Sequence, residues 1–173
     1  LKYLIDGTPV AMNEARTVIV TLPPDAAMNP ARTVVWTPDA APVEIPKFTA
    51  VALNKDGVLV GTKPPELTTT IVADLRLAFT WKDGQFTPLG VIEGGTGFDP
   101  AAINDAGLVV GTYTTADGKV SGFFYSPADG ISDIKRLVRS GGTDRFFNST
   151  AMGLPDINNS SLIIGALHDV NAG

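Results

Sequence analysis

Four asparagines recur in one sequence context and are the most regular polar feature of the chain. They are Asn13, Asn54, Asn104 and Asn158, separated by 41, 50 and 54 residues. A set of equivalent side-chain amides could contact a ligand around a ring. We favour a structural role, because an Asn that opens a tight turn bonds its own backbone two residues later.

A second group of candidate residues lies in the segment "SGGTDRFFNST", which is an insertion between the third and fourth repeats. Insertions in repeat folds map to loops on one face, which is often the binding face. We therefore expect the charged and aromatic residues of this segment to form the main contact surface: Asp144, Arg145, Phe146 and Phe147.

Aromatic residues also recur at matching places, as Trp36, Trp81 and Tyr125. An exposed ring is a platform for a sugar face, whereas a buried ring fills the space between sheets. Packing is the favoured interpretation, and Trp81 is kept as a candidate ligand-binding residue.

The acidic turns "NKDG", "NDAG", "WKDG" and "TADG" raise the question of calcium. Calcium needs about six or seven oxygen ligands, and neither EF-hand spacing nor a run of alternating Asp is present. We predict no metal and no cofactor, with calcium at one or two of these turns as the alternative.

The composition restricts catalytic chemistry. There is no cysteine and one histidine, His168, which excludes thiolate nucleophiles, Cys-based metal sites and His clusters. Asp169 follows His168, but neighbouring residues in a strand point to opposite faces. No feature selects a catalytic pair among the 18 acidic residues, so no catalytic residue is assigned.

The elements that must position these residues are short strands. After each Asn come three residues of turn composition and then an apolar run: "TVIV", "VLVG", "LVVG" and "LIIG". Gly57 and Gly107 can take the positive φ that closes such a hairpin. Arg16 and Ser161 occupy this place in the outer copies, where we expect less regular turns.

Each unit continues with another apolar run, a second turn and a short strand. In order, the runs are "TVVW", "LAFTW" and "GFFY", and the final strands are "PVEI", "QFTPL" and "ISDI". No segment has a sustained helical periodicity. The sequence predicts an all-β fold, a β-propeller-like array of four-stranded repeats with about four blades.

The stretch "AAINDAGLVVGTYTTADGKVSGFFYSPADGISDI" resembles a bacterial extracellular repeat, the HAF family, named for its His-Ala-Phe signature. The resemblance covers residues 48 to 134 well. It departs at the named position, because Leu77-Ala78-Phe79 and Ser121-Gly122-Phe123 have no His. The resemblance implies a secreted or surface-exposed bacterial protein, and it carries over no catalytic residue.

The expected repeat units are approximately residues 10–47, 48–97, 98–140 and 151–173, the last completed by residues 1–9. In this arrangement the N- and C-terminal strands pair and close a ring of four units. The alternative is that the chain is part of a larger ring. It begins with Leu1, so a leader removed from the chain and a start inside a longer chain are both open.

Composition limits the partners. The net charge of -5 disfavours a nucleic-acid surface, and no apolar run reaches the ~20 residues that span a bilayer. We expect a secreted or cell-surface, non-catalytic recognition or scaffold module that binds carbohydrate or an extracellular protein through blade loops. The alternative is a carbohydrate-active hydrolase or lyase with acidic residues at the propeller axis.

Overall fold

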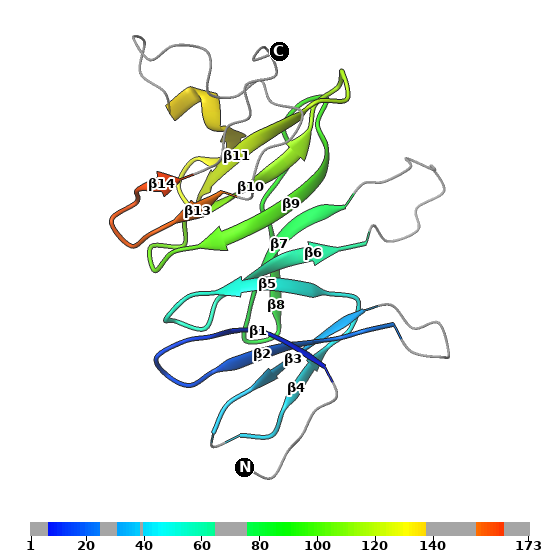
Figure 1. The fold of residues 1–173 in the computed structure, drawn as a ribbon, viewed down its shortest axis with the longest axis vertical. Coiled ribbons are helices and arrows are strands. Elements are labelled where there is room, and N and C mark those ends of the chain that lie inside the picture. Colours follow the sequence, from blue (N-terminus) through cyan, green and yellow to red (C-terminus); the bar gives the residue numbers. More distant parts are fainter. Residues whose placement is uncertain (1–6, 25–30, 39, 65–75, 138–154, 165–173) are drawn as a thin grey trace, which may run out of the picture.

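The computed structural model describes residues 7–24, 31–38, 40–64, 76–137 and 155–164. These residues form antiparallel sheets, so the predicted all-β class is confirmed (Figure 1). One short 3-10 helix, η1 (Ile134–Leu137), follows the last strand of the third sheet. The described residues contain no helix long and apolar enough to cross a membrane.

The strands follow the predicted repeats. Unit 1 is a four-stranded sheet of β1 (Thr8–Met12), β2 (Val18–Leu22), β3 (Arg32–Trp36) and β4 (Val43–Ile45). Unit 2 contains β5 (Thr49–Leu53), β6 (Leu59–Lys63), β7 (Leu77–Lys82) and β8 (Gln85–Pro88). Unit 3 contains β9 (Thr96–Ile103), β10 (Val109–Thr114), β11 (Val120–Ser126) and β12 (Gly130–Asp133). Unit 4 is the two-stranded hairpin of β13 (Asp156–Ile157) and β14 (Ile163–Ile164).

Each repeated Asn opens a three-residue hairpin loop. In unit 2 the Gly57 N–H donates to the Asn54 carbonyl at 3.2 Å, and Gly57 has a φ of 74°. A type I turn followed by a left-handed residue is a common way to join two antiparallel strands. Gly107 has the same role in unit 3, with a φ of 77°.

The outer turns are as regular as the inner ones, so our expectation for Arg16 and Ser161 is wrong. Both residues take the left-handed conformation, at φ 62° and 59°. Their N–H groups donate to Asn13 and Asn158 carbonyls at 3.0 Å, which is the bond made by the glycines. The asparagine, rather than the glycine, is the feature that the four turns share.

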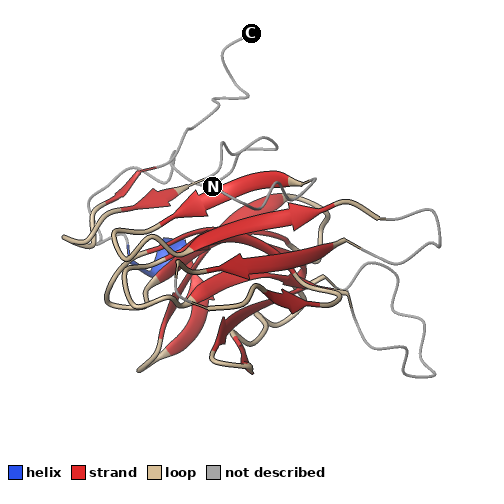
Figure 2. Cartoon of the chain, turned by 90° about the horizontal axis from the view of Figure 1, so that it is seen from below, coloured by secondary structure: helices blue, strands red, loops and turns tan. Residues whose placement is uncertain are grey.

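The sheets stack in chain order, with β1, β5, β9 and β13 along one side. Figure 1 shows the unit 1 sheet toward one end of the long axis and the β13–β14 hairpin toward the other. Viewed along that axis, successive sheets overlap (Figure 2). Because the strands of one unit pair only with each other, the units are joined through their faces and turns.

Two apolar clusters lie between the units. The first joins unit 1 to unit 2 and includes Ile19, Val35, Leu59 and Trp81. The second joins unit 2 to unit 3 and includes Val60, Ala78, Phe98, Ile103, Val109 and Phe123. Each sheet therefore buries a face on its neighbour, which is the usual source of stability in repeat proteins.

The start of the chain differs from the expected unit boundaries. Thr8 and Pro9 pair with Thr21 and Val20 in the first sheet, whereas we expected residues 1–9 to complete unit 4. The hydrophobic pattern favours this pairing, because Val10 and Ala11 of the same strand pack on the cluster between units 1 and 2. Residues 1–6 and 165–173 lie outside the described residues, and ring closure by the two ends stays a prediction.

Candidate functional site

The four Asn hairpins lie in a row along one edge of the stack, on the left in Figure 1. Each Asn side chain first organises its own turn. The Asn54 Oδ1 accepts hydrogen bonds from the Asp56 and Val58 N–H groups, at 3.1 and 3.0 Å. The Asn104 and Asn158 side chains bond their own turns in the same pattern.

In the first three units the other end of the Asn side chain reaches the following unit. The Asn13 Nδ2 donates to the Asn54 carbonyl at 3.0 Å, and the Asn54 Nδ2 donates to the Asn104 carbonyl at 3.2 Å. The Asn104 Nδ2 donates to the Asn158 carbonyl at 3.1 Å. These three bonds form a continuous asparagine ladder across all four units.

A second line of bonds runs beside the asparagine ladder, through the residue that follows each Asn. The Lys55 N–H donates to Asp105 Oδ1 at 3.0 Å, and the Asp105 N–H donates to Asn159 Oδ1 at 2.9 Å. The Asn159 Nδ2 in turn donates to Asp105 Oδ2 at 2.6 Å. Asp105 thus serves as a connector between units, which explains an acidic turn without a metal ion.

The two inner members of the asparagine ladder are buried, with Asn54 5% and Asn104 3% exposed. A buried amide is costly unless its donors and acceptors are paired, and these side chains satisfy both. The structural interpretation of the repeated Asn residues therefore accounts for them, and the ligand interpretation is not needed.

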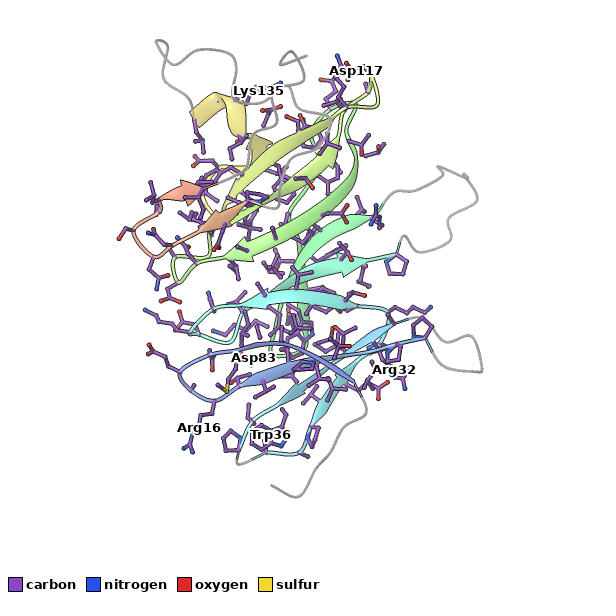
Figure 3. All side chains as sticks on the ribbon, viewed as in Figure 1. Arg16, Arg32, Trp36, Asp83, Asp117 and Lys135 are labelled. Carbon is purple, nitrogen blue, oxygen red and sulfur yellow. The ribbon has the colours of Figure 1, made fainter. Side chains whose placement is uncertain are left out.

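The solvent-exposed part of this row is the tips of the hairpins. The exposed tip residues have mixed charge and polarity: Glu14, Arg16, Lys55, Asp56, Ser160 and Ser161. Their backbone is fixed by the asparagine ladder, so these side chains project from a rigid edge. Figure 3 shows Arg16 projecting at the end of this row.

Of the three recurring aromatic residues, Trp81 and Tyr125 pack against the preceding unit. Trp81 is 9% exposed and belongs to the cluster between units 1 and 2. Tyr125 packs against the cluster between units 2 and 3. Trp81 therefore has a packing environment instead of the exposed face that a sugar platform requires.

The other predicted contact residues, Asp144, Arg145, Phe146 and Phe147, lie outside the described residues, as do His168 and Asp169. Their role as a contact surface stays a prediction.

The structure also contains a polar cluster that sequence reasoning missed. The Tyr113 hydroxyl donates to Asp133 Oδ2 at 2.6 Å, and the Ser121 Oγ approaches the same oxygen at 3.3 Å. Burial, together with the hydrogen bond and charge of Asp133, raises the pKa of Tyr113 to about 12. The Asp133 Oδ1 accepts the Lys135 N–H at 2.8 Å, so this carboxylate also caps η1.

These three residues come from β10, β11 and β12, so their approach depends on the strand register. Tyr113 of β10 pairs directly with Ser121 of β11. Asp133 of β12 pairs with Phe123, two residues further along β11. No repeat of residue types marked them in the sequence. The cluster fastens the outermost strand of unit 3, and its acidic member is already occupied by three donors.

The tip of the β10–β11 hairpin is a further charged turn. The side chain of Asp117 accepts hydrogen bonds from Lys119, at 2.7 Å, and from Thr115. These bonds, led by the one from Lys119, lower the pKa of Asp117 to about 2. Over the described ranges, no group of three or more acidic or His side chains is placed to hold a metal ion.

Comparison with known proteins found no matching family model, no matching curated protein and no matching solved structure. The resemblance to the HAF repeat therefore remains an expectation from the residues quoted above.

Proposed function

We propose that this chain is a non-catalytic recognition or scaffold module with a propeller-like arrangement of repeat units. Its contact surface is formed by the loops of the repeats, with the insertion at 135–150 as the main contributor. The partner is carbohydrate or another protein at the cell exterior. The extracellular location and the bacterial source rest on the HAF resemblance alone.

One observation carries the proposal: the regular polar residues hold the repeats together instead of converging on a pocket. The asparagine ladder and Asp105 join successive turns, and Asp133 holds Tyr113 and η1. Asp117 is paired with Lys119 in the same hairpin. Such an edge presents loops at fixed, repeated intervals, which suits the binding of an extended partner.

The alternative of a carbohydrate-active hydrolase or lyase gains no support from the described residues. Glycoside hydrolysis uses two carboxylates that face one another across the scissile bond. The carboxylates with resolved partners in the described ranges bond turns, strands or basic side chains instead.

The experiment is a thermal unfolding series of the chain with cello-, xylo- and chito-oligosaccharides, each with added calcium or with a chelator. Binding to the folded state raises the melting temperature. Phe146→Ala and Arg145→Ala should abolish that rise while the melting temperature of the free protein stays nearly unchanged. Val91→Ala is the control, because Val91 is 57% exposed and lies in the connector between units 2 and 3.

Two results would contradict the proposal. A large loss of stability in the Phe146 or Arg145 variant would assign the insertion to packing. Turnover of any oligosaccharide would instead support the hydrolase or lyase alternative.

A further inference from the structure

The first and last described units expose apolar side chains on opposite faces of the stack. The three most exposed of the large hydrophobic side chains in the described ranges are Met12 at 67%, Leu162 at 63% and Ile164 at 62%. Met12 is in unit 1, and the other two are in unit 4. Terminal repeats that end an array normally present a polar outer face. Here each end unit exposes large apolar side chains.

Met12 occupies a position at which the other units wholly or partly bury an apolar side chain. Its equivalents, one residue before the repeated Asn, are Leu53, Ile103 and Ile157. Leu53 packs on the cluster shared with unit 1, and Ile103, 8% exposed, belongs to the cluster shared with unit 2. Ile157, 7% exposed, is on β13, which contacts β9 and β10 of unit 3. Among the described residues, Met12 is the one of these four with no preceding unit to pack on.

The outer face of unit 1 continues this row across the sheet. Met12 pairs with Val18, and Val18 pairs with Trp36. The matching row of unit 2, Leu53, Leu59 and Trp81, packs on unit 1, and Leu59 is fully buried there. Figure 3 shows Trp36 at the end of the molecule beyond the first sheet.

The unit 4 end lacks the opposite partner. Ile164 is equivalent to Ile19, Val60 and Val110, six residues after the repeated Asn. Each of these three has an exposed fraction of 0% because its own unit is followed by another. Ile164 keeps 62% of its surface exposed.

The hydrogen-bonding groups at the two ends are also complementary, with a donor at unit 4 and an acceptor at unit 1. The Asn158 Nδ2 bonds no residue in the described ranges, whereas the equivalent amides of Asn13, Asn54 and Asn104 each bond the following unit. The Asn13 carbonyl accepts the Arg16 N–H, as the Asn54 carbonyl accepts the Gly57 N–H. The Asn54 carbonyl also accepts a hydrogen bond from the Asn13 Nδ2. The Asn13 carbonyl oxygen has a second lone pair that could accept an equivalent bond from another copy.

We propose that the unit 4 face of one chain docks on the unit 1 face of a second copy, which continues the stack head to tail. Ile164 and Leu162 then cover Met12, Val18 and Trp36, and the Asn158 Nδ2 donates to the Asn13 carbonyl of the second copy. The junction repeats the geometry that already joins units 1 to 4 within the chain. Such an interface is heterologous, so it builds a ring if its rotation closes and a filament if it does not.

The test is sedimentation velocity of the chain over a concentration series, with two variants that each block one end. Wild type should associate with increasing concentration, in steps of the 18.1 kDa chain mass. Met12→Glu and Ile164→Glu should each remain monomeric, because a charge in an apolar junction is costly. Val91→Glu, an exposed site away from both ends, should associate like wild type.

Mixing the two blocked variants tests the head-to-tail sense. Met12→Glu retains an intact unit 4 face and Ile164→Glu an intact unit 1 face, so an equimolar mixture should form a dimer and nothing larger. If either variant fails to fold, as judged by circular dichroism, Met12→Gln and Asn158→Asp replace them; each should weaken association at least tenfold.

A wild type that stays monomeric at every concentration would overturn the proposal, since the unit 4 face would then not bind the unit 1 face of a second copy. Association that survives in both blocked variants would also overturn it, because another surface would be responsible. Neither result bears on the oligosaccharide experiment, so this inference and the proposed function can fail separately.

Discussion

Three of the four repeated asparagines, Asn13, Asn54 and Asn104, use both functional atoms of the side-chain amide. The oxygen accepts from the backbone of its own turn, and the nitrogen donates to the carbonyl of the next unit. Asp can supply the first bond but has no donor at pH 7, and Ser or Thr has a single hydroxyl oxygen in place of the separate acceptor and donor atoms of an amide. This double requirement explains the Asn at the first three turns, and the bonds within the turn account for Asn158.

The role within the turn follows from sequence, because a turn-opening Asn has a known local bonding pattern. The bond to the next unit does not, because it joins residues 41 to 54 positions apart and depends on how the sheets stack. Gly57 and Gly107 were predictable for a similar local reason. The left-handed Arg16 and Ser161 were not, because their own residue types disfavour that conformation.

The backbone requirement at the turn gives the first prediction. Gly57→Ala should lower the free energy of unfolding by about 1 kcal/mol, because a Cβ strains the left-handed conformation. No atom lies within 4 Å of that added Cβ, so the effect comes from the backbone alone. Chemical denaturation measures the loss. Gly84 has a φ of 85° and equally open surroundings, so Gly84→Ala should cost a similar amount.

At the scale of the elements, each sheet was predictable because its strands follow one another in sequence and pair as hairpins. The sets of strands named from apolar runs and turn residues match the three four-stranded sheets. The start of β1 was misassigned. Its apolar and small residues do not themselves say whether the strand joins the sheet that follows it or the one at the other end of the chain.

The fastening of β12 gives a prediction about pH. Because the folded pKa of Tyr113, about 12, lies above the ordinary value of 10.0, the folded chain holds its proton where the unfolded chain loses it. The contribution of Tyr113 to stability is therefore complete below pH 10 and is lost as the pH rises to about 12.

Near-ultraviolet absorbance measures this ionisation directly, since the chain has three tyrosines. We expect one of them to ionise late, near pH 12, and Tyr113→Phe to remove this late step. The matched control is Tyr125→Phe, which should leave the late step in place. A late step that survives in Tyr113→Phe would contradict the assignment.

At the scale of the whole molecule, the chain is a row of similar units in which each unit contacts its neighbours. The stability of such arrays depends on the interfaces between units as much as on the units themselves. Both interface clusters, and both lines of hydrogen bonds, join units that are consecutive in the chain. The sequence predicted the repeat units. It did not predict that Met12 and Ile164 are exposed, because the exposure of these side chains depends on which units lie next to them.

The most direct test of this account compares one substitution at two rungs of the asparagine ladder, Asn104→Asp and Asn158→Asp. Aspartate keeps the oxygen that organises the turn and removes the donor to the next unit. Asn104 is 3% exposed and bonded to Asn158, whereas the Asn158 amide bonds no residue in the described part of the chain.

The measurement is the free energy of unfolding in urea at a protein concentration low enough to keep the chain monomeric. We expect Asn104→Asp to lose about 2 kcal/mol or more, because it buries a charge against a carbonyl that has lost its donor. Asn158→Asp should change stability by less than about 0.5 kcal/mol. Equal losses at the two positions would show that the turn alone needs the asparagine, and would contradict the asparagine ladder as the joint between units.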